Sequence, residues 1–190
     1  MSSSSFYAIK AGQQLGPMSL RDFAGHWLRG DFDENTRIWH KGMGSDWGWP
    51  DEWLINTKDR AEQSRRYFES RSTRALIWEF PCWELLRTME YDFLPRDWRA
   101  RWEECGGQFF GEKQRMIAKK GDPVWQQLGD QERYQDALGV PYPPFVLGTS
   151  MMVREIVRED AIALGIIEKT STSEDEYREK MRRKGGVGGC

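Results

Sequence analysis

Tryptophan is the residue that most constrains how this chain folds. Ten of the 190 residues are tryptophan, far above ordinary usage, and five of those ten lie in the first 56 residues. A domain of roughly this size buries only about 60% of the surface of its unfolded chain, so it needs large side chains to build a core. We therefore expect much of the aromatic density in residues 1–56 to hold together a small domain.

The apolar residues of this first segment predict one helix between short strands. Five of them fall on one stripe at helical spacing: Leu20, Phe23, Ala24, Trp27 and Leu28. Ser19 is a typical N-cap residue and Gly30 a typical C-terminal stop. Segments 6–9 and 36–40 favour strands, because they are short and rich in aromatic and β-branched residues. A small α/β domain is the result.

The rest of the chain favours helices. Residues 57–80 are highly charged and predict a long solvated helix that acts as a connector. Beyond it we predict helices at 82–90 and 94–106, a short helix that begins at Asp122-Pro123, and a strand at 151–157.

These elements predict the α+β class, with a small α/β domain followed by a mostly α-helical domain with a minor strand. The predicted divisions are the small domain at 1–56, the charged connector at 57–80, the tryptophan-rich helical domain at 81–168, and a flexible polar and glycine-rich tail at 169–190.

Charge and hydropathy argue against nucleic-acid and membrane partners. The net charge is −2, with five Lys/Arg against seven Asp/Glu in residues 1–56, so neither part carries a basic footprint. No apolar run approaches the roughly 20 residues of a membrane span, and Met1–Ser5 lacks the features of a signal peptide. We expect a cytoplasmic protein that binds neither nucleic acid nor membrane.

Residues that could carry catalysis or bind a metal are scattered. Cys82, Cys105 and Cys190 are widely spaced, and only His26 and His40 could join them as ligands, so we predict neither a zinc site nor a cofactor. The sequence has no nucleophile elbow, HExxH motif or dinucleotide fingerprint. We predict no catalytic residue, and we interpret the chain as a binding or assembly protein and not an enzyme.

The first segment resembles the GYF domain family. The residues that carry the resemblance are Phe6-Tyr7, Gly16-Pro17-Met18, Phe23, Trp27 and Gly30-Asp31-Phe32. A downstream run is similar to the bacterial variant of the family: Thr36, Ile38-Trp39, Gly42-Met43 and Asp46-Trp47. The resemblance covers roughly residues 6 to 49 and implies a small domain with an aromatic groove for proline-rich peptides.

Carried over position by position, the resemblance implies seven peptide-binding residues: Tyr7, Pro17, Met18, Trp27, Phe32, Trp39 and Trp47. It implies a non-enzymatic adaptor with a protein or peptide partner, because proline-rich segments are already ordered and stack well on aromatic faces. The chain departs from the family at Asp31, which replaces the central tyrosine, at Met18, and at Trp27, which is displaced by one residue. The alternative is that these aromatic residues mainly form a core.

A second resemblance concerns residues 80–167, which look like segments of head-morphogenesis or minor head proteins of phages and prophages. The residues that carry it are Pro95-Arg96-Asp97-Trp98, Arg101-Trp102, Gly106-Gly107, Arg115 to Ala118, Asp122 to Trp125, Tyr142 to Phe145, and Asp160 to Gly165. It implies an alternative function as a structural or assembly component of a particle, with virion subunits as partners and the virion as location.

The chain also contains a candidate ligand for its own groove. Pro141, Tyr142, Pro143, Pro144 and Phe145 form a proline-rich segment that must be extended, because proline fixes its own φ and restricts its predecessor. Binding within the chain would close the groove, and binding to a neighbouring copy would lead to self-association. The alternative is that the segment is a rigid loop over the second core.

Overall fold

The computed structural model describes residues 5–88, 96–169 and 176. Its first elements are β1 (Phe6–Lys10), β2 (Gln13–Met18), α1 (Leu20–Arg29), β3 (Arg37–His40), the 3-10 helix η1 (Lys41–Met43), α2 (Glu52–Ile55), α3 (Thr57–Arg71) and α4 (Arg74–Glu79). They are followed by β4 (Cys82–Arg87), α5 (Trp98–Glu104), β5 (Phe109–Phe110), β6 (Arg115–Lys119), α6 (Pro123–Leu128), β7 (Met151–Ile156) and α7 (Arg158–Ala163). Helices and antiparallel sheets occur together, which confirms the α+β class.

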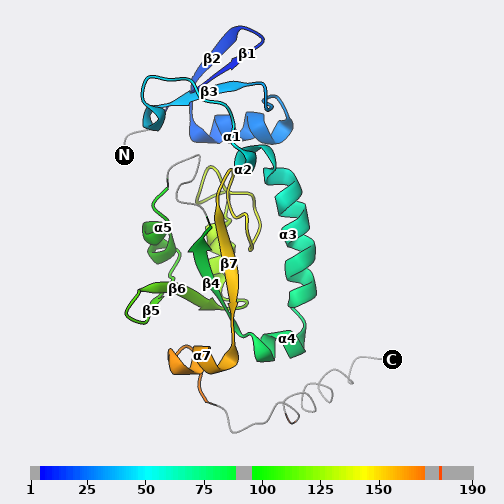
Figure 1. Ribbon diagram of the computed structural model, residues 1–190, viewed down its shortest axis with the longest axis vertical. Coiled ribbons are helices and arrows are strands. Elements are labelled where there is room, and N and C mark those ends of the chain that lie inside the picture. Colours follow the sequence, from blue (N-terminus) through cyan, green and yellow to red (C-terminus); the bar gives the residue numbers. More distant parts are fainter. Residues whose placement is uncertain (1–4, 89–95, 170–175, 177–190) are drawn as a thin grey trace, which may run out of the picture.

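The first domain is a three-stranded antiparallel sheet, in the order β2-β1-β3, with α1 across one face. The predicted helix limits are confirmed. Ser19 and Asp22 form a capping box, in which Asp22 N donates to Ser19 Oγ at 3.1 Å, and Gly30 ends α1 at φ 84°. In Figure 1, α1 lies between this sheet and the rest of the molecule. The opposite face of the sheet therefore points outward at one end.

Strand β2 was not expected from the sequence. The strands predicted in this segment were 6–9 and 36–40, but the chain also reverses within Ala11 and Gly12 and pairs with β1 from Gln13 onward. The burial pattern explains why periodicity did not indicate a strand, since all of β2 except Met18 is exposed. An edge strand of this kind is held by its backbone ladder and not by a buried face.

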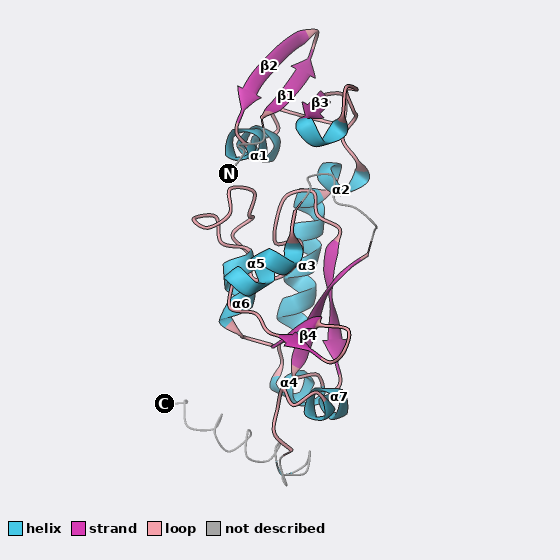
Figure 2. Cartoon of the chain, turned by 90° about the vertical axis from the view of Figure 1, so that its left-hand side faces the viewer, coloured by secondary structure: helices cyan, strands magenta, loops and turns pink. Residues whose placement is uncertain are grey.

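The predicted connector is two helices. Helix α3 is charged, with Arg65 paired to Glu62 at 2.9 Å and to Glu69 at 3.2 Å, but its Phe68 is buried among side chains of the second half. Figures 1 and 2 show α3 running from the first domain toward α4 and α7 at the far end. The exact domain limits at 56, 80 and 168 stay predictions. Most of the predicted tail lies outside the described residues.

The second half contains a four-stranded antiparallel sheet, in the order β5-β6-β4-β7. The prediction of a mostly helical domain with a minor strand is therefore wrong, and the helix expected at 82–90 is the central strand β4 where the chain is described. Periodicity does not separate a helix from a strand in so short an apolar run. The backbone of β4 pairs with both β6 and β7, and this tertiary pairing decides its conformation.

Two other predicted elements of the second half are confirmed. Helix α6 begins at Asp122-Pro123 as expected, and β7 matches the predicted strand at 151–157. Helix α5 begins at Trp98, because the carboxylate of Asp97 accepts from Arg99 N and Ala100 N. The predicted start of that helix at residues 94–95 lies outside the described residues.

One buried side chain of the second half lies in the core of the first domain. Leu147, from the loop before β7, is fully buried in the core of the first domain, which otherwise consists of Phe6, Ala8, Phe23, Ala24, Trp27, Phe32, Ile38 and Leu54. Gly148 N donates to Thr57 Oγ1 at 3.1 Å, and Gly148 adopts a φ of 61° against Leu54. The core of the first domain is thus completed by a residue from the second half.

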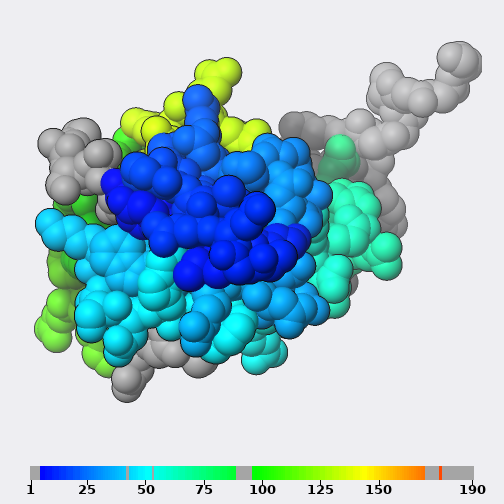
Figure 3. Space-filling model, turned by 90° about the horizontal axis from the view of Figure 1, so that it is seen from above, coloured from blue at the N-terminus to red at the C-terminus, as the bar shows by residue number. Residues whose placement is uncertain are grey.

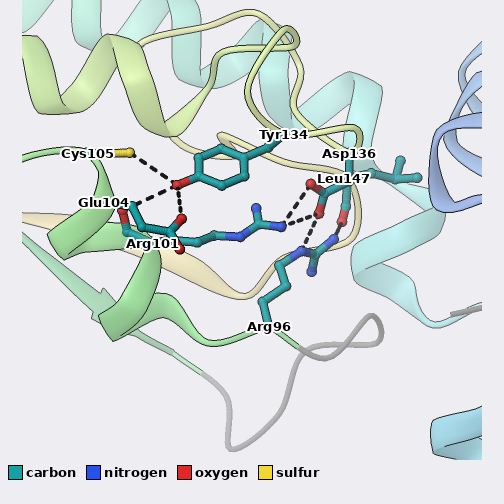
Figure 4. A network of polar contacts seen from close by, with 7 residues as sticks. All are labelled: Arg96, Arg101, Glu104, Cys105, Tyr134, Asp136 and Leu147. Atoms are coloured by element: carbon teal, nitrogen blue, oxygen red, sulfur yellow. Dashed lines mark hydrogen bonds and ion pairs between the residues drawn. The ribbon is translucent and has the colours of Figure 1, made fainter. Parts of the chain in front are cut away.

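A buried charge cluster holds the loop that carries Leu147 (Figure 4). Arg96 Nε contacts Asp136 Oδ2 at 2.5 Å, Arg101 Nη2 contacts Asp136 Oδ1 at 3.1 Å, and Arg96 Nη2 donates to Leu147 O at 2.5 Å. Leu147 N donates to Asp136 O at 2.8 Å. Burial alone would raise the pKa of the Asp136 carboxyl, but the guanidinium groups of Arg96 and Arg101 outweigh it and lower this pKa. Asp136 is therefore ionised at neutral pH.

Leu147→Ala should destabilise the whole chain by about 2–5 kcal/mol, because it leaves a cavity in the first core. Urea unfolding of the full chain measures this loss. Leu15→Ala is the matched control, since Leu15 is 41% exposed and its truncation should cost only about 0.5 kcal/mol. An equal loss in both variants would contradict the role assigned to Leu147.

Asp136→Asn should cost about 3–5 kcal/mol at pH 7, because it leaves Arg96 and Arg101 without their buried partner. The native pKa of Asp136 is depressed, so the unfolded state takes up the proton first as the pH falls. The stabilisation is present above about pH 4 and is lost progressively below it. Urea unfolding at several pH values should show the gap between wild type and variant narrowing in acid. A gap that stays constant down to about pH 2 would refute this.

Candidate functional site

Aromatic side chains line the face of the first sheet that α1 does not cover. Side chains alternate along a strand, so burial of Phe6 and Ala8 on the inner face places Tyr7 on the outer face. Tyr7 pairs with Trp39 across β1 and β3, and the centroids of the two rings lie 5.5 Å apart at 59°. The Trp39 ring is fixed at its other end, because its Nε1 donates to Gly44 O at 2.7 Å.

A bridge beyond β3 extends this row of rings. Ile38 and Gly48 form an antiparallel bridge with two backbone hydrogen bonds of 2.9 Å. This pairing places Trp47 across from Trp39, and Trp49 across from Arg37. The guanidinium of Arg37 lies 5.0 Å from the centroid of the Trp49 ring, which is 56% exposed. We call Tyr7, Trp39, Trp47 and Trp49 the outer aromatic face.

Strand β2 closes one edge of the outer aromatic face. Gly16 has a φ of 110°, and a Cβ atom at this position would lie 2.6 Å from Phe6 O and 3.1 Å from Tyr7 Cδ1. Only glycine fits so close to the Tyr7 ring without displacing backbone. Pro17 follows it and is exposed. The predicted residues Tyr7, Pro17, Trp39 and Trp47 are therefore accessible on this strand-built surface.

Three other predicted groove residues lie on the inner side of the sheet. Trp27 is 6% exposed and Phe32 is 3% exposed, and Trp27 Nε1 donates to Leu54 O at 3.0 Å. Met18 is partly buried against the same core. The structure thus separates the seven predicted residues into two groups on opposite faces, and Trp27 and Phe32 support the domain from within.

Asp31, which replaces the family's central tyrosine, is part of a polar cluster. Its Oδ2 lies 2.9 Å from His26 Nδ1 and accepts from Arg29 Nε at 3.0 Å, and its backbone oxygen accepts from Lys10 Nζ at 2.6 Å. The hydrogen bonds from His26 and then Arg29 lower the pKa of the Asp31 carboxyl. The His26 ring stacks on Phe32 with centroids 4.9 Å apart. This position offers fixed charges where the family offers a ring.

The proline-rich segment of the chain is built into the second core. Phe145 is fully buried and stacks on Trp125 with centroids 6.0 Å apart, while Tyr142 stacks on Phe68 at 5.7 Å. Pro143 and Pro144 are buried, and Pro141 is half-buried. In this structure the segment is a loop of the second core, and its buried residues are not presented to the outer aromatic face.

Trp49 belongs to the outer aromatic face and Arg37 packs on its ring, but neither was among the predicted site residues. A pattern in the sequence could have indicated Trp49, because it follows Trp47 by two residues and a strand places such residues on one face. Arg37 could have been found in the same way from Trp39. The sequence did not predict the strand-like bridge at Gly48. The alternation of side chains along a strand was therefore not considered for residues 47–49.

The first domain is thus a small sheet with one helix on its inner side and a row of aromatic rings on its outer side. Residues 6–47 match the family model described as GYF domain 2, so they form a GYF-type domain at the N-terminal end. GYF domains bind proline-rich peptides, and this match supports a protein-interaction role. It lends no support to the resemblance of residues 80–167 to phage head proteins.

Comparison of the chain with curated proteins and with solved structures gave no match. Within the described ranges, no helix has the length and apolar character needed to cross a membrane. The same residues include no group of three or more His, Cys, Asp or Glu side chains arranged to hold a metal ion.

The two groups of aromatic residues should respond differently to mutation. Trp27→Phe should cost about 1–3 kcal/mol, because it removes the buried hydrogen bond to Leu54 O and part of a core ring. Trp49→Phe should change stability by less than about 0.5 kcal/mol, because Trp49 is on the surface. Urea unfolding followed by far-UV circular dichroism checks both. A larger loss for Trp49→Phe than for Trp27→Phe would contradict the assignment of faces.

Proposed function

We propose that this chain is a non-enzymatic adaptor whose GYF-type domain binds a proline-rich or extended segment of a partner protein on the outer aromatic face. The observation that carries the proposal is the row of Tyr7, Trp39 and Trp47 across neighbouring strands. Figure 3 shows this end of the molecule from above, where residues of the N-terminal domain form the surface.

The spacing of the row suits a polyproline helix. Neighbouring strands lie about 4.8 Å apart, so rings two strands apart are separated by about 10 Å. A polyproline helix rises about 3.1 Å per residue and repeats every three residues, so prolines one turn apart lie about 9 Å apart. A peptide that crosses the strands would place such prolines near Tyr7 and Trp47, with Trp39 between them.

The energetics also favour this kind of ligand. A polyproline helix is ordered before it binds, so it loses little conformational entropy on docking to a surface of this small size. Trp39 is held by its hydrogen bond to Gly44 O, and Trp49 by Arg37, so two rings are fixed before the ligand arrives. Fixed rings lose little side-chain entropy on binding. The second half would then supply the adaptor with its other connections.

Binding is tested by titrating the full chain with proline-rich peptides and following tryptophan fluorescence. Trp39→Ala and Trp47→Ala should each weaken saturable binding about tenfold, because each removes a ring at the centre of the surface. Tyr67→Ala is the control, since Tyr67 is 51% exposed on α3 and lies outside the outer aromatic face. An affinity that is unchanged in both tryptophan variants would refute this site.

A further inference from the structure

The second half contains an aromatic crevice of its own. A cavity of about 340 Å³ opens where α3, β4, the start of α6 and the Pro141–Tyr142 turn meet. Its aromatic lining consists of Phe68, Trp83, Trp125 and Tyr142, and Pro123 and Pro141 lie beside them. The proline segment of this chain is therefore part of the crevice wall.

The aromatic rings that line the crevice pack against one another and form a continuous apolar wall. Phe68 and Tyr142 stack at 17°, whereas Trp83 stands edge-on to both Phe68, at 75°, and Trp125, at 73°. Phe68, Trp83 and Trp125 are held by the second core, and only Tyr142 is half-exposed. A rigid ring that packs on this wall loses less conformational entropy on binding than a flexible side chain does.

A hydrogen-bond donor in the crevice lining lacks an acceptor. Trp83 is 6% exposed, and among the described residues its buried Nε1 has no hydrogen-bond partner. Buried indole N–H groups usually find an acceptor, and leaving one unpaired is costly. A carbonyl oxygen of a bound segment at this point would supply the missing acceptor.

The charges at the crevice rim have one sign. Glu69 and Asp122 line it, and no Lys or Arg does. Glu69 is already paired with Arg65, but Asp122 has no cation within ion-pair distance in the described part of the chain. Lys120 lies 5.5 Å from the centroid of the Trp83 ring and is paired with Glu155 at 2.6 Å, outside the lining. A basic residue beside the inserted ring would complement Asp122.

We propose that this crevice is a docking site for a proline-bearing segment of a partner protein that has a lysine or arginine next to the proline. The pyrrolidine ring packs on the aromatic wall of the crevice, a backbone carbonyl accepts from Trp83 Nε1, and the basic side chain pairs with Asp122. This site is distinct from the outer aromatic face and does not rest on the function proposed for the first domain.

Two ten-residue probe peptides test the proposal on the full chain. Each has a central run of prolines, flanked by two arginines in one peptide and by two glutamates in the other. Calorimetric titration should show at least threefold tighter binding of the arginine peptide, as expected for one solvent-exposed ion pair. Equal affinity for the two peptides, or no binding of the arginine peptide, overturns the proposal.

Two variants locate the binding. Asp122→Asn keeps the N-cap of α6, because asparagine caps as well as aspartate, and it should abolish the preference for the arginine peptide. Asp130→Asn is the matched control, since Asp130 also caps a backbone N–H, that of Glu132 at 2.8 Å, but lies outside the crevice lining. Trp83→Phe removes the indole donor and should weaken the arginine peptide about fivefold.

The same titrations separate the two sites. Trp39→Ala should leave the arginine preference intact, because Trp39 lies on the outer aromatic face. If Trp39→Ala abolishes arginine-peptide binding while Asp122→Asn and Trp83→Phe leave it unchanged, the crevice proposal is overturned and the first-domain proposal stands. Far-UV circular dichroism checks that Trp83→Phe is folded. If Trp83→Phe does not fold, the arginine preference of Asp122→Asn tests the proposal by itself.

Discussion

The arrangement of the two halves depends on the ion pairs that the Asp136 carboxylate forms with Arg96 and Arg101. Bringing one carboxylate and two guanidinium groups out of water costs several kcal/mol per ion, so this cluster is not a large net source of stability. Its effect is positional. Arg96 pairs with the Asp136 carboxylate and donates a hydrogen bond to Leu147 O, while Leu147 N donates to Asp136 O. Both backbone polar groups of Leu147 are therefore bonded, which fixes the loop that carries it. Burying the leucine side chain then contributes about 1.5–3 kcal/mol to the first core.

Because Leu147 of the second half helps to fill the first core, the high tryptophan content of the first domain is not explained by that core alone. A three-stranded sheet with one helix has little apolar surface to bury, but Leu54 and Leu147 complete its inner face. Trp27 is in that core, whereas Trp39, Trp47 and Trp49 are on the other face of the sheet. The small domain therefore does not need all its large rings for stability. The rings left outside become a surface that a partner can use.

The sequence predicted those parts of the fold whose causes are local. Helix α1 was found from its stripe and caps, and α6 from Asp122-Pro123. Strand β4 was mistaken for a helix because its backbone partners are distant in sequence, and the insertion of Leu147 depends on a contact across some ninety residues that no spacing reveals. The order of family residues located the candidate site but not its two sides, because a motif does not state which face each residue occupies. The crevice combines four segments and was not predicted.

The proline segment shows how burial changes the interpretation of a pattern. From sequence alone, Pro141 to Phe145 resembles a ligand, but stacking on Phe68 and Trp125 makes it part of the second core, and its first two residues line the crevice. The crevice lies near the end of α3, at Phe68, whereas the outer aromatic face belongs to the first sheet, which precedes the start of α3 at Thr57. From Thr57 to Phe68 this helix rises about 16 Å at about 1.5 Å per residue. One partner that engages both surfaces therefore needs at least five or six extended residues between its two proline segments, at about 3.1 Å per residue. A shorter partner can occupy only one surface at a time, and the two surfaces would then bind separate segments without the gain in effective concentration that linkage provides.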